Sequence, residues 1–518
     1  MSSNPLNIYT GLKSLQDYHN PDASPPLPLV ELPPPLNPYY DNGVRIYAKI
    51  MTALPAQNVK ALPALNLLRD GVNPSTTDTI IEYSSGSTVI SLGILSRVYY
   101  GIQDTRAYLS NKTHLTKLRL MQFFGLKVKL FGGPSTPDAD DEYGGVYAAE
   151  EEARRSERIL NPNQYKNHAN WKSHTIWTGP QILKQLPQIN LICAAMGTTG
   201  TMSGLGTYLK SEKQSVFCLG VCIAPGNEIP GPRMYSMIQR IDFPWRDTVD
   251  AVEEVNAEDA FLNSVKLSRE GIICGPSSGM QYTALLRFLK QRISSQSLHS
   301  LQGPDGLTHC AFLCCDLPYQ YLDEYFDRLG AEHFPVIENE SLLEVDTYSY
   351  ESKWEILPLD LPTHLGVDIT RSRANGSAPH LEKEDAVENA NQPNGLPPAT
   401  IIDLRADSDY HASHVEQSTN LPLHSLSGGT ESPWKDPRIL KQQWEELDGI
   451  LSHDNPSIFS KEDGKPQEAR RVLLICYDGA VSRIAASILR AKGAEAFSLR
   501  GGYRGLGSEV TGQFTNGT

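Results

Sequence analysis

The sequence lacks the features that would place it in a membrane, on a secretory route or on a nucleic acid. No run of apolar residues approaches the ~20 that cross a bilayer, and the amino end, MSSNPLNIYTGLK, has neither the basic start nor the apolar centre of a secretion signal. Lysine and arginine are not clustered and the formal net charge is −14, which argues against binding to a phosphate backbone. We therefore expect a cytoplasmic protein that binds neither membrane nor nucleic acid.

Cysteine is also sparse. The chain has eight cysteines in 518 residues and no CxxC pair, so neither a zinc site nor a disulfide framework is indicated. Runs such as FLCCD and VFCLGVC place several of them in apolar segments, where we expect buried thiols. No metal site is predicted.

What the sequence does contain is an alternation of short apolar or β-branched runs with longer amphipathic ones. TIIEY precedes VISLGILSRVYYG, RAYLS precedes THLTKLRLMQFFG, and INLICAAMG precedes MSGLGTYLKS. This pattern is typical of strands that are connected through helices. We predict an α/β fold of parallel sheets covered by helices.

A polar segment divides the chain. Residues 370–398 are rich in Gly, Pro, Asn and charge and poor in large apolar residues, which predicts a flexible linker. Beyond it the α/β pattern resumes in ATIIDLRA, VLLICYDG, SRIAASILRAKG and AFSLRGG. We therefore predict a first domain over residues 1–369 and a smaller one over residues 399–518.

Lys60 is unusual because it stands in NVKALPALNLLRD, at the start of a mostly apolar helical run. Pro63 suits the first turn of a helix, so Lys60 should lie just before or at the helix N-terminus. The helix dipole and an apolar pocket would both disfavour the ammonium form, and a neutral lysine amine forms Schiff bases with carbonyls. From this stretch alone, a lysine that packs its stem and extends its amine into water is the favoured interpretation.

Three glycine-bearing loops change that balance, because each joins a predicted strand to a predicted helix. YSSGST (residues 83–88) can direct hydroxyl and N–H groups at a carboxylate, MGTTGTMSG (196–204) offers N–H groups to a phosphate, and CGPSSGM (274–280) precedes another helix. Any one of them could be an ordinary turn, since a lone glycine-rich loop is weak evidence. Together with Lys60 they indicate a cofactor site.

Taken in order, these segments resemble the cysteine synthase and cystathionine β-synthase family of enzymes, which use pyridoxal phosphate (PLP). NVKALPALN is similar to the cofactor-lysine segment, EYSSGSTVIS to the substrate loop, AAMGTTGTMSGLGTYLK to the phosphate loop and GIICGPSSGM to the pyridine-nitrogen segment. NPNQYKNHANW followed by TGPQI is a longer match. The resemblance covers about Pro28 to Gln291 and implies PLP fold type II, with two α/β subdomains as in the tryptophan synthase β chain.

The resemblance implies a role for each matching residue. Lys60 would hold PLP and act as the catalytic base, Asn58 and Ser87 would assist the cofactor, and Ser277 would hydrogen-bond the pyridine nitrogen. A neutral hydroxyl at that nitrogen favours loss of a group from Cβ. The substrate carboxylate would be bound by Ser84, Ser85, Ser87, Thr88 and Gln164. The cofactor phosphate would be bound by Gly197, Thr198, Thr199, Gly200 and Thr201.

The sequence departs from the family pattern at three places. Ala61 and Leu62 follow the lysine where the family has Asp-Arg, Ser87 replaces an asparagine, and Thr199 replaces a glycine. These changes spare the lysine chemistry but loosen the prediction of the substrate. The serine-rich loop is also similar to that of cysteine desulfhydrase-like relatives.

A second constellation surrounds Cys476, which ends an apolar run in VLLICYDGAVSRIAASILRAKG. We expect a helix to begin near Ser482, and loop N–H groups at its N-terminus would stabilise a thiolate. For an isolated residue, a buried cysteine at a strand end is the simpler interpretation.

Motifs around this cysteine resemble a rhodanese, or sulfurtransferase, domain over about residues 399–506. IIDLRADSDYHASHV is similar to its opening, with Asp403, Arg405 and His414 in matching places; CYDGAVS is similar to its active loop and LRGGY to its closing signature. The resemblance implies that Cys476 carries sulfur as a persulfide. Val481 stands where many relatives have arginine and Asp478 adds negative charge, so we expect thiosulfate, an anion, to be a poor donor.

The sequence therefore predicts a sulfur enzyme that joins a PLP-dependent transferase or lyase to a persulfide carrier. The predicted reaction is β-replacement on an activated serine such as O-acetylserine, with a small-molecule sulfur donor, giving cysteine or a related amino acid. A homodimer is expected. Two alternatives stay open: a cysteine desulfhydrase that passes sulfur to Cys476, and a regulatory scaffold that has lost catalysis.

Overall fold

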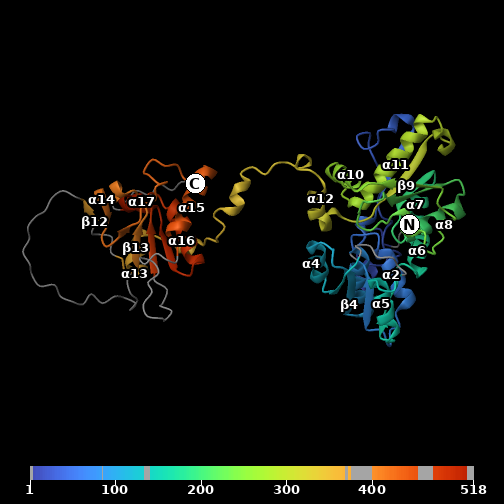
Figure 1. Ribbon diagram of the computed structural model, residues 1–518, viewed down its shortest axis with the longest axis horizontal. Helices are drawn as coiled ribbons and strands as arrows, with labels where there is room; N and C mark the ends of the chain where they lie inside the picture. Colours follow the sequence, from blue (N-terminus) through green and yellow to red (C-terminus); the bar gives the residue numbers. More distant parts are fainter. Residues whose placement is uncertain are drawn as a thin grey trace, which may run out of the picture. The chain divides into compact units, whose positions relative to one another are not determined.

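The chain forms two compact units, each with its own sheets and hydrophobic cores. The computed structural model describes residues 4–84, 86–133, 141–367, 372–374, 399–452 and 471–509. Unit 1 is Met1–Pro335 and unit 2 is Val336–Thr518, and Figure 1 colours both along the sequence.

Unit 1 contains two sheets. The six-stranded sheet has the order β1-β2-β10-β7-β8-β9 and is parallel except for β1, which runs antiparallel to β2. The four-stranded sheet has the order β5-β4-β3-β6 and is parallel. The strands are β1 (Leu29–Glu31), β2 (Val44–Ile50), β3 (Thr79–Tyr83), β4 (Asp104–Ser110), β5 (Lys127–Phe131), β6 (Ile159–Leu160), β7 (Leu191–Ala195), β8 (Phe217–Ile223), β9 (Ala251–Val255) and β10 (Thr308–Cys314).

Helices separate these strands along the chain, as the sequence pattern predicted. The α-helices are α1 (Ser14–Tyr18), α2 (Ala61–Gly71), α3 (Ser87–Tyr100), α4 (Leu115–Phe123), α5 (Gly145–Arg154), α6 (Ala169–Ser173), α7 (Gly179–Gln185), α8 (Gly200–Glu212), α9 (Tyr235–Ile238), α10 (Ala257–Arg269), α11 (Pro276–Ser294) and α12 (Leu322–Arg328). A π-helical turn, η3 (His174–Thr178), joins α6 to α7, and the short helix η5 (Pro318–Tyr321) precedes α12. Figure 1 shows α6 between α2 and α8.

The six-stranded sheet is buried on both faces because its strands send alternate side chains into two cores. All seven residues of β10 are buried. Phe312 packs in the core covered by α10 and α11, whereas its neighbours Ala311 and Leu313 pack in the core under α2 and α8. A parallel sheet covered by helices on both faces confirms the predicted α/β class.

The four-stranded sheet forms a second, smaller lobe of unit 1. Val89 of α3 and Met121 of α4 pack with Leu109 in one small core, and Val146 of α5 packs with Ile81 in another. Unit 1 therefore consists of two α/β subdomains, as the resemblance implied.

Unit 2 is built on one five-stranded parallel sheet with the order β11-β17-β16-β13-β15. Ile402 and Leu474 pack against α15 and α16, and Ile401 and Leu473 pack on the opposite face beside α13. The strands are β11 (Glu355–Ile356), β13 (Thr400–Asp403), β15 (Thr419–Asn420), β16 (Arg471–Ile475) and β17 (Glu495–Leu499), and the helices are α13 (Leu361–Leu365), α14 (Asp407–Ala412), α15 (Pro437–Ile450), α16 (Ala480–Ala491) and α17 (Gly502–Glu509).

Unit 2 begins earlier in the chain than the second domain predicted at residues 399–518. β11 pairs with β17, and Leu361 and Leu365 of α13 pack with Ile401, so residues 336–367 add a strand and a helix to this sheet. The sequence pattern places these residues in the first domain. Of the predicted linker, residues 372–374 form β12 (Ser372–Ala374), which pairs with β14 (Ser413–Val415), and the rest lies outside the described residues.

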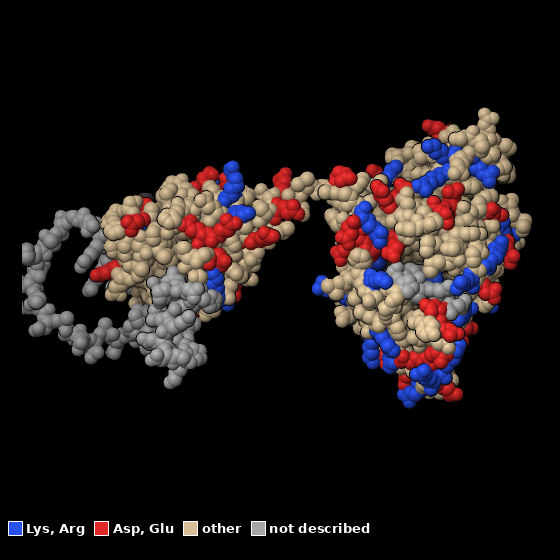
Figure 2. Space-filling model, viewed as in Figure 1, with Lys and Arg blue, Asp and Glu red and all other residues tan. Residues whose placement is uncertain are grey.

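The surface carries charges of both signs. On the face in Figure 2, acidic and basic side chains are interspersed over unit 1. In the part of the chain that the structure describes, no helix is both long enough and apolar enough to span a bilayer.

Gly204 tests the packing of α8 against α6. A Cβ at this position would overlap the carbonyl of Trp171 and the Cβ of His174. We expect Gly204→Ala to lower the free energy of unfolding of unit 1 by about 2 kcal/mol, because neither backbone can move without shifting its helix. Gly132→Ala is the matched control, since a Cβ there meets no atom within 4 Å. Equal urea midpoints for the two variants would contradict this packing.

Candidate active sites

Lys60 lies at the start of α2, as the sequence predicted. It is the N-cap residue, and its backbone N–H donates to Asn58 Oδ1 at 2.9 Å. Ser91 of α3 donates to the same oxygen at 3.1 Å. The buried amide of Asn58 therefore links α2 and α3 directly beside the lysine.

The amine of Lys60 lies among buried groups, although the residue as a whole has intermediate exposure. Burial lowers the pKa of Lys60, whereas Cys315 and Asp316 raise it. These two residues follow β10 and are fixed beside the lysine, because Val59 N–H donates to the Cys315 carbonyl at 2.7 Å and Asn58 forms a β-bridge with Asp316. A lysine amine with a lowered pKa is a nucleophile for carbonyl carbons.

Lys49 is a second buried lysine, and its contacts distinguish it from Lys60. Burial lowers the pKa of Lys49 to about 7. Its amine donates to the Leu27 carbonyl at 2.7 Å and to the side-chain oxygens of Gln181 and Gln185 at 3.1 and 2.7 Å. All three N–H groups of an ammonium are thus satisfied, so Lys49 has a structural role.

The serine-rich loop joins β3 to α3 and meets Gln164. Thr88 Oγ1 donates to Gln164 Oε1 at 2.8 Å, and Gln164 Nε2 donates to the Tyr83 carbonyl at 3.1 Å. Ser84 is buried in the same loop. The structure therefore brings together three of the residues predicted to bind the substrate carboxylate.

Ser85 and Ser87 are the other two residues of this loop that were predicted to bind the substrate carboxylate. Ser87 is the first residue of α3, and its side chain lies close enough to the buried carboxyl of Asp316 to lower the pKa of that group. Ser85 lies outside the described residues. The loop thus contacts the segment that follows β10, which also approaches Lys60.

The second glycine loop joins β7 to α8 and contacts the segment of α6 and η3. Asn170 Nδ2 donates to Thr198 Oγ1 at 3.1 Å, and Thr201 Oγ1 lies 3.2 Å from His174 Nε2. Both threonines are buried. These contacts fix the loop at the N-terminus of α8, where the helix dipole and free N–H groups favour an anion.

Glycine is required at two positions of this loop. A Cβ on Gly200 would overlap Asn170 Oδ1, and a Cβ on Gly197 would overlap the Gly231 carbonyl. Asn170 Oδ1 is buried and accepts no hydrogen bond from the described residues. The backbone of the loop therefore packs directly on its neighbours, and its N–H groups are not screened by side chains of its own.

Thr199 has a left-handed backbone conformation, with φ at 59°. A β-branched residue rarely adopts positive φ, whereas glycine does so without steric cost. This is the physical reason for the glycine in the family pattern. Ser203 donates to Thr199 Oγ1 at 3.4 Å, which ties the hydroxyl to the next turn of α8.

Ser277 lies buried in the first turn of α11, which begins at Pro276. Its side chain hydrogen-bonds the thiol of Cys315, and Gln281 donates to the same sulfur at 3.2 Å. Lys60 lies within electrostatic reach of this thiol. The predicted cofactor lysine and the predicted pyridine-nitrogen residue therefore meet around Cys315.

Three residues at this site, Cys315, Asp316 and His174, were missing from the sequence analysis. Burial lowers the pKa of His174 to about 3, and the charge of Lys60 acts in the same direction, so the ring is neutral. Its Nδ1 lies 2.9 Å from Thr178 Oγ1. Cys315 and Asp316 directly follow an apolar strand, and the carboxyl ends of parallel strands are where such sheets bind ligands. That position is the signal that could have found them.

In unit 2, Cys476 follows β16, and α16 begins at Ala480, two residues before the predicted start. Its Sγ accepts N–H groups of Gly479 at 3.1 Å and Ser482 at 3.4 Å, and no part of the residue is exposed. Burial raises the pKa of the thiol, and the negative charge of Asp478 raises it further. Hydrogen bonds from Ser482 and from the Asp478 N–H lower the pKa. The expected N–H groups are present and lower the pKa of the thiol, whereas burial raises it by more.

Asp403 and Arg405 form a buried ion pair at 2.7 Å. The Arg405 guanidinium also lies 3.4 Å from the centre of the Tyr503 ring. His414 lies in β14 and its ring stacks on Tyr410 at 4.2 Å between centroids. These three predicted rhodanese residues therefore hold the β13 loop and the LRGGY segment in place.

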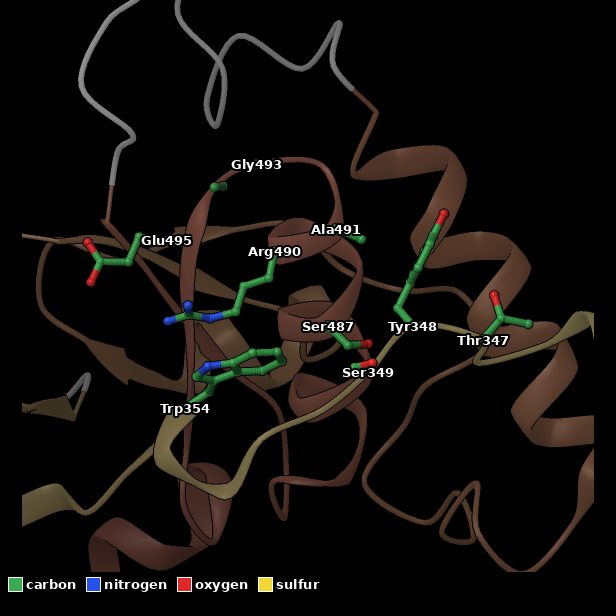
Figure 3. A pocket seen from close by; sticks show the side chains of 10 residues that line it. Thr347, Tyr348, Ser349, Trp354, Ser487, Arg490, Ala491, Gly493 and Glu495 are labelled. Atoms are coloured by element: carbon green, nitrogen blue, oxygen red, sulfur yellow. The ribbon is translucent and has the colours of Figure 1, made fainter. Parts of the chain in front are cut away.

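A cavity of about 670 Å³ lies elsewhere in unit 2 (Figure 3). Its lining residues are Thr347, Tyr348, Ser349, Trp354, Ser487, Arg490, Ala491, Gly493, Ala494 and Glu495. Figure 3 shows the Arg490 guanidinium beside the Trp354 ring, at 4.5 Å from a ring centroid. Cys476 does not line this cavity, so it is not the predicted sulfur site.

Comparison with known families agrees with both constellations. Residues 23–299 match the family model described as pyridoxal-phosphate dependent enzyme, and residues 383–509 match the rhodanese-like domain. Because the first match covers more than half of the chain, the protein belongs to the family of PLP-dependent enzymes. The predicted fold type II unit, the PLP cofactor and the C-terminal rhodanese-like domain are thereby confirmed.

The relatives indicate the type of enzyme more closely. Cysteine synthase B of Escherichia coli (strain K12) is 28% identical over 303 residues, which are 57% of this chain and 91% of the relative. Cysteine synthase B of Salmonella typhimurium is 30% identical over 256 residues, 48% and 80% of the two chains. The solved structure of O-acetyl serine sulfhydrylase isoform 3 from Entamoeba histolytica is 23% identical, with 62% of this chain and 95% of that chain covered and a TM-score of 0.49. The protein is a cysteine synthase-like PLP enzyme with a sulfurtransferase-type domain.

The residues of the first site fit PLP. The Lys60 amine suits the aldehyde carbon, the loop at the start of α8 suits a phosphate because Gly197 and Gly200 leave its backbone uncovered, and the Ser277 hydroxyl suits a ring nitrogen. The cofactor identified through the family thus agrees with the donor groups that this chain provides.

Thr199 tests the strain in the phosphate loop. We expect Thr199→Gly to be more stable to urea than Thr199→Ala by about 1 kcal/mol, because both variants lose the hydroxyl but only alanine keeps a Cβ at positive φ. The two unfolding curves, measured without added PLP, give the comparison directly. A more stable alanine variant would show that this backbone conformation is not strained.

Proposed function

We propose that unit 1 catalyses β-replacement on an activated serine such as O-acetylserine, forming cysteine or a related β-substituted amino acid. We also propose that Cys476 carries the sulfur as a persulfide. The observation that best supports the first proposal is that Lys60 and Ser277 both lie beside Cys315, while His174 lies near Lys60 and contacts Thr201 of the phosphate loop.

Bound PLP supplies an electron sink for the pair of electrons left at Cα when its proton is removed. Lys60 would hold the aldehyde carbon through Nζ, with Asn58 fixing the lysine backbone and Ser277 donating to or accepting from the ring nitrogen. The phosphate would be held by N–H and hydroxyl groups of the loop, namely Gly197, Thr198, Thr199, Gly200 and Thr201.

The substrate carboxylate would be bound by the loop before α3. Ser84 and Ser87 would supply hydroxyl donors, and Thr88 and Gln164 are already ordered by their mutual hydrogen bond of 2.8 Å. A site ordered in advance loses less entropy when it binds. We extend the same role to Ser85, which is adjacent in sequence.

Lys60 would then act as the base at Cα. Because burial lowers its pKa, more of the amine is neutral near pH 7 than for a lysine in water, and a neutral amine can accept the proton. Departure of the group on Cβ and addition of sulfide or a thiol at the same carbon complete the replacement. If water competes with the thiol, the same residues would produce pyruvate and ammonia.

In unit 2, the Cys476 thiolate would attack the terminal sulfur of a small-molecule persulfide donor. A new S–S bond forms to Cys476, the S–S bond of the donor breaks, and the donor leaves as its thiolate. The negative charge of Asp478 disfavours an anionic donor such as thiosulfate. Two equivalents of a thiol would reduce the Cys476 persulfide, releasing its outer sulfur as sulfide and leaving as a disulfide. Because both chemistries lie on one chain, tethering would raise the effective concentration of this sulfide for unit 1. The homodimer and the cytoplasmic location stay predictions.

A product screen tests the reaction. We expect the full-length protein with O-acetylserine and sulfide to form cysteine, and Lys60→Ala to lose at least a thousandfold in rate because both the base and the covalent anchor are removed. Lys49→Met is the matched control, since it removes another buried amine that lies outside the site. Products are identified by mass spectrometry.

The same screen separates the alternatives. Sulfide released from cysteine without a second substrate would favour a cysteine desulfhydrase. A protein that retains no PLP and forms no product from any β-substituted serine would favour a non-catalytic scaffold.

A labelling experiment tests the sulfur carrier. We expect persulfide at Cys476 after exposure of the protein to a small-molecule persulfide without net negative charge, such as cysteamine persulfide, and its complete loss in Cys476→Ser, because the acceptor sulfur is removed. Cys315→Ser is the control, since Cys315 is the cysteine of intermediate exposure in the described part of the chain and would collect unspecific label. Equal labelling of wild type and Cys476→Ser would contradict the carrier role.

A further inference from the structure

We propose that Asp316 is a positioning residue for Lys60: its buried carboxylate orients the amine and stabilises the ammonium that forms when Lys60 takes the proton from Cα. The inference rests on the proposed function, because it assigns a partner to the lysine that acts there as the base. It concerns a residue to which neither the motifs nor the family comparison gave a role.

The backbone of Asp316 is fixed between the two segments that matter most for the site. The residue follows β10 and forms an antiparallel bridge with Asn58, two residues before Lys60. Its carbonyl accepts the N–H of Gly275, the N-cap residue of α11, at 2.8 Å. Asp316 thus joins the loop that carries Lys60 to the helix that carries Ser277.

The side chain is held through one of its two oxygens. Tyr321 donates its hydroxyl to Oδ2 at 2.6 Å, and Gln320 donates to the same atom at 3.2 Å. Both residues belong to η5, which begins two residues after Asp316. Tyr321 and Gln320 therefore set the orientation of the carboxylate, and the short connection between Asp316 and η5 holds all three residues together.

The second oxygen has no such partner. Among the described residues no group donates to Asp316 Oδ1, although the residue is only 7% exposed. The oxygen packs so closely on Gly275 that a Cβ there would overlap it. A buried carboxylate oxygen without a donor is costly, so this atom is free to interact with a charge or a donor inside the site.

Among the described residues around Asp316, Lys60 is the cation that forms no ion pair with another carboxylate. Lys117 of α4 is the other lysine near Asp316, and it forms a buried ion pair with Glu324 of α12. Its amine also lies 4.8 Å from the Tyr321 ring centroid. The remaining titratable neighbours of Lys60 are Cys315 and His174, and the latter ring is neutral.

The ionisation of Asp316 agrees with this role at neutral pH. Burial raises its pKa to about 6, while the hydrogen bond from Tyr321, the charges of Lys117 and Lys60 and the nearby Ser87 side chain oppose the increase. The group is therefore ionised above about pH 6 and can stabilise an ammonium there. Below that pH it becomes neutral, and its influence on Lys60 should disappear.

The step itself moves one proton. The Cα–H bond breaks, its electron pair stays on the substrate, and the proton forms a new N–H bond at Lys60 Nζ. Asp316 neither gains nor loses a proton, and it acts by lowering the energy of the charged product of the transfer.

The experiment measures the pKa of Lys60 directly, in the full-length chain after removal of PLP. Competitive acetylation with acetic anhydride between pH 6 and 11, followed by mass spectrometry of the Lys60 peptide, gives the fraction of neutral amine at each pH. We expect Asp316→Asn and Asp316→Ser to lower this pKa by about one unit, because an ionised neighbour is lost. Glu150→Gln is the control, as it removes another buried carboxyl group of unit 1 that does not act on Lys60.

Two results would overturn the inference. One is an unchanged Lys60 pKa in whichever of the two Asp316 variants keeps the wild-type circular dichroism spectrum. The other is an equal shift in Glu150→Gln, which would show a general effect of removing a buried carboxyl group. Because the readout does not depend on turnover, failure of the proposed reaction would leave this comparison intact and would be recognised separately by the product screen.

Discussion

The hydrogen bond from Val59 N–H to the Cys315 carbonyl, at 2.7 Å, joins the start of α2 to the end of β10, and the geometry of the first site depends on it. It places Lys60 at a helix N-terminus and beside a buried strand end at the same time. The dipole of α2 and the removal of water both disfavour a charged amine. Without this connection the lysine would be one more surface cation.

Burial has opposite consequences for the two nucleophiles of the chain. It lowers the pKa of Lys60 and so favours the neutral amine, which is the reactive form. It raises the pKa of Cys476 and so favours the neutral thiol, which is the unreactive form. The structure therefore favours the reactive form of Lys60. Cys476 needs the N–H groups of its loop to stabilise its thiolate when a donor approaches.

The sequence predicts well what is encoded locally. Strand runs, the start of α2 and the loop before α8 each lie within about ten residues, and the structure has them where the pattern indicated. Contacts between distant parts of the chain could not be predicted. Asp316 lies 256 positions from Lys60 along the chain, and the pairing of β10 with β2, continued by the bridge between Asn58 and Asp316, brings them together. The net rise in the pKa of Cys476 could not be predicted, because burial is a tertiary property. The two residues of β11 were missed because so short a strand shows no periodicity.

Reduction of the purified protein with borohydride tests the central claim most directly, because it fixes PLP permanently to the amine that holds it. After proteolysis and mass spectrometry, the account predicts a phosphopyridoxyl group on Lys60 and on no other lysine. The label on Lys49, or on a lysine of the surface, would contradict it.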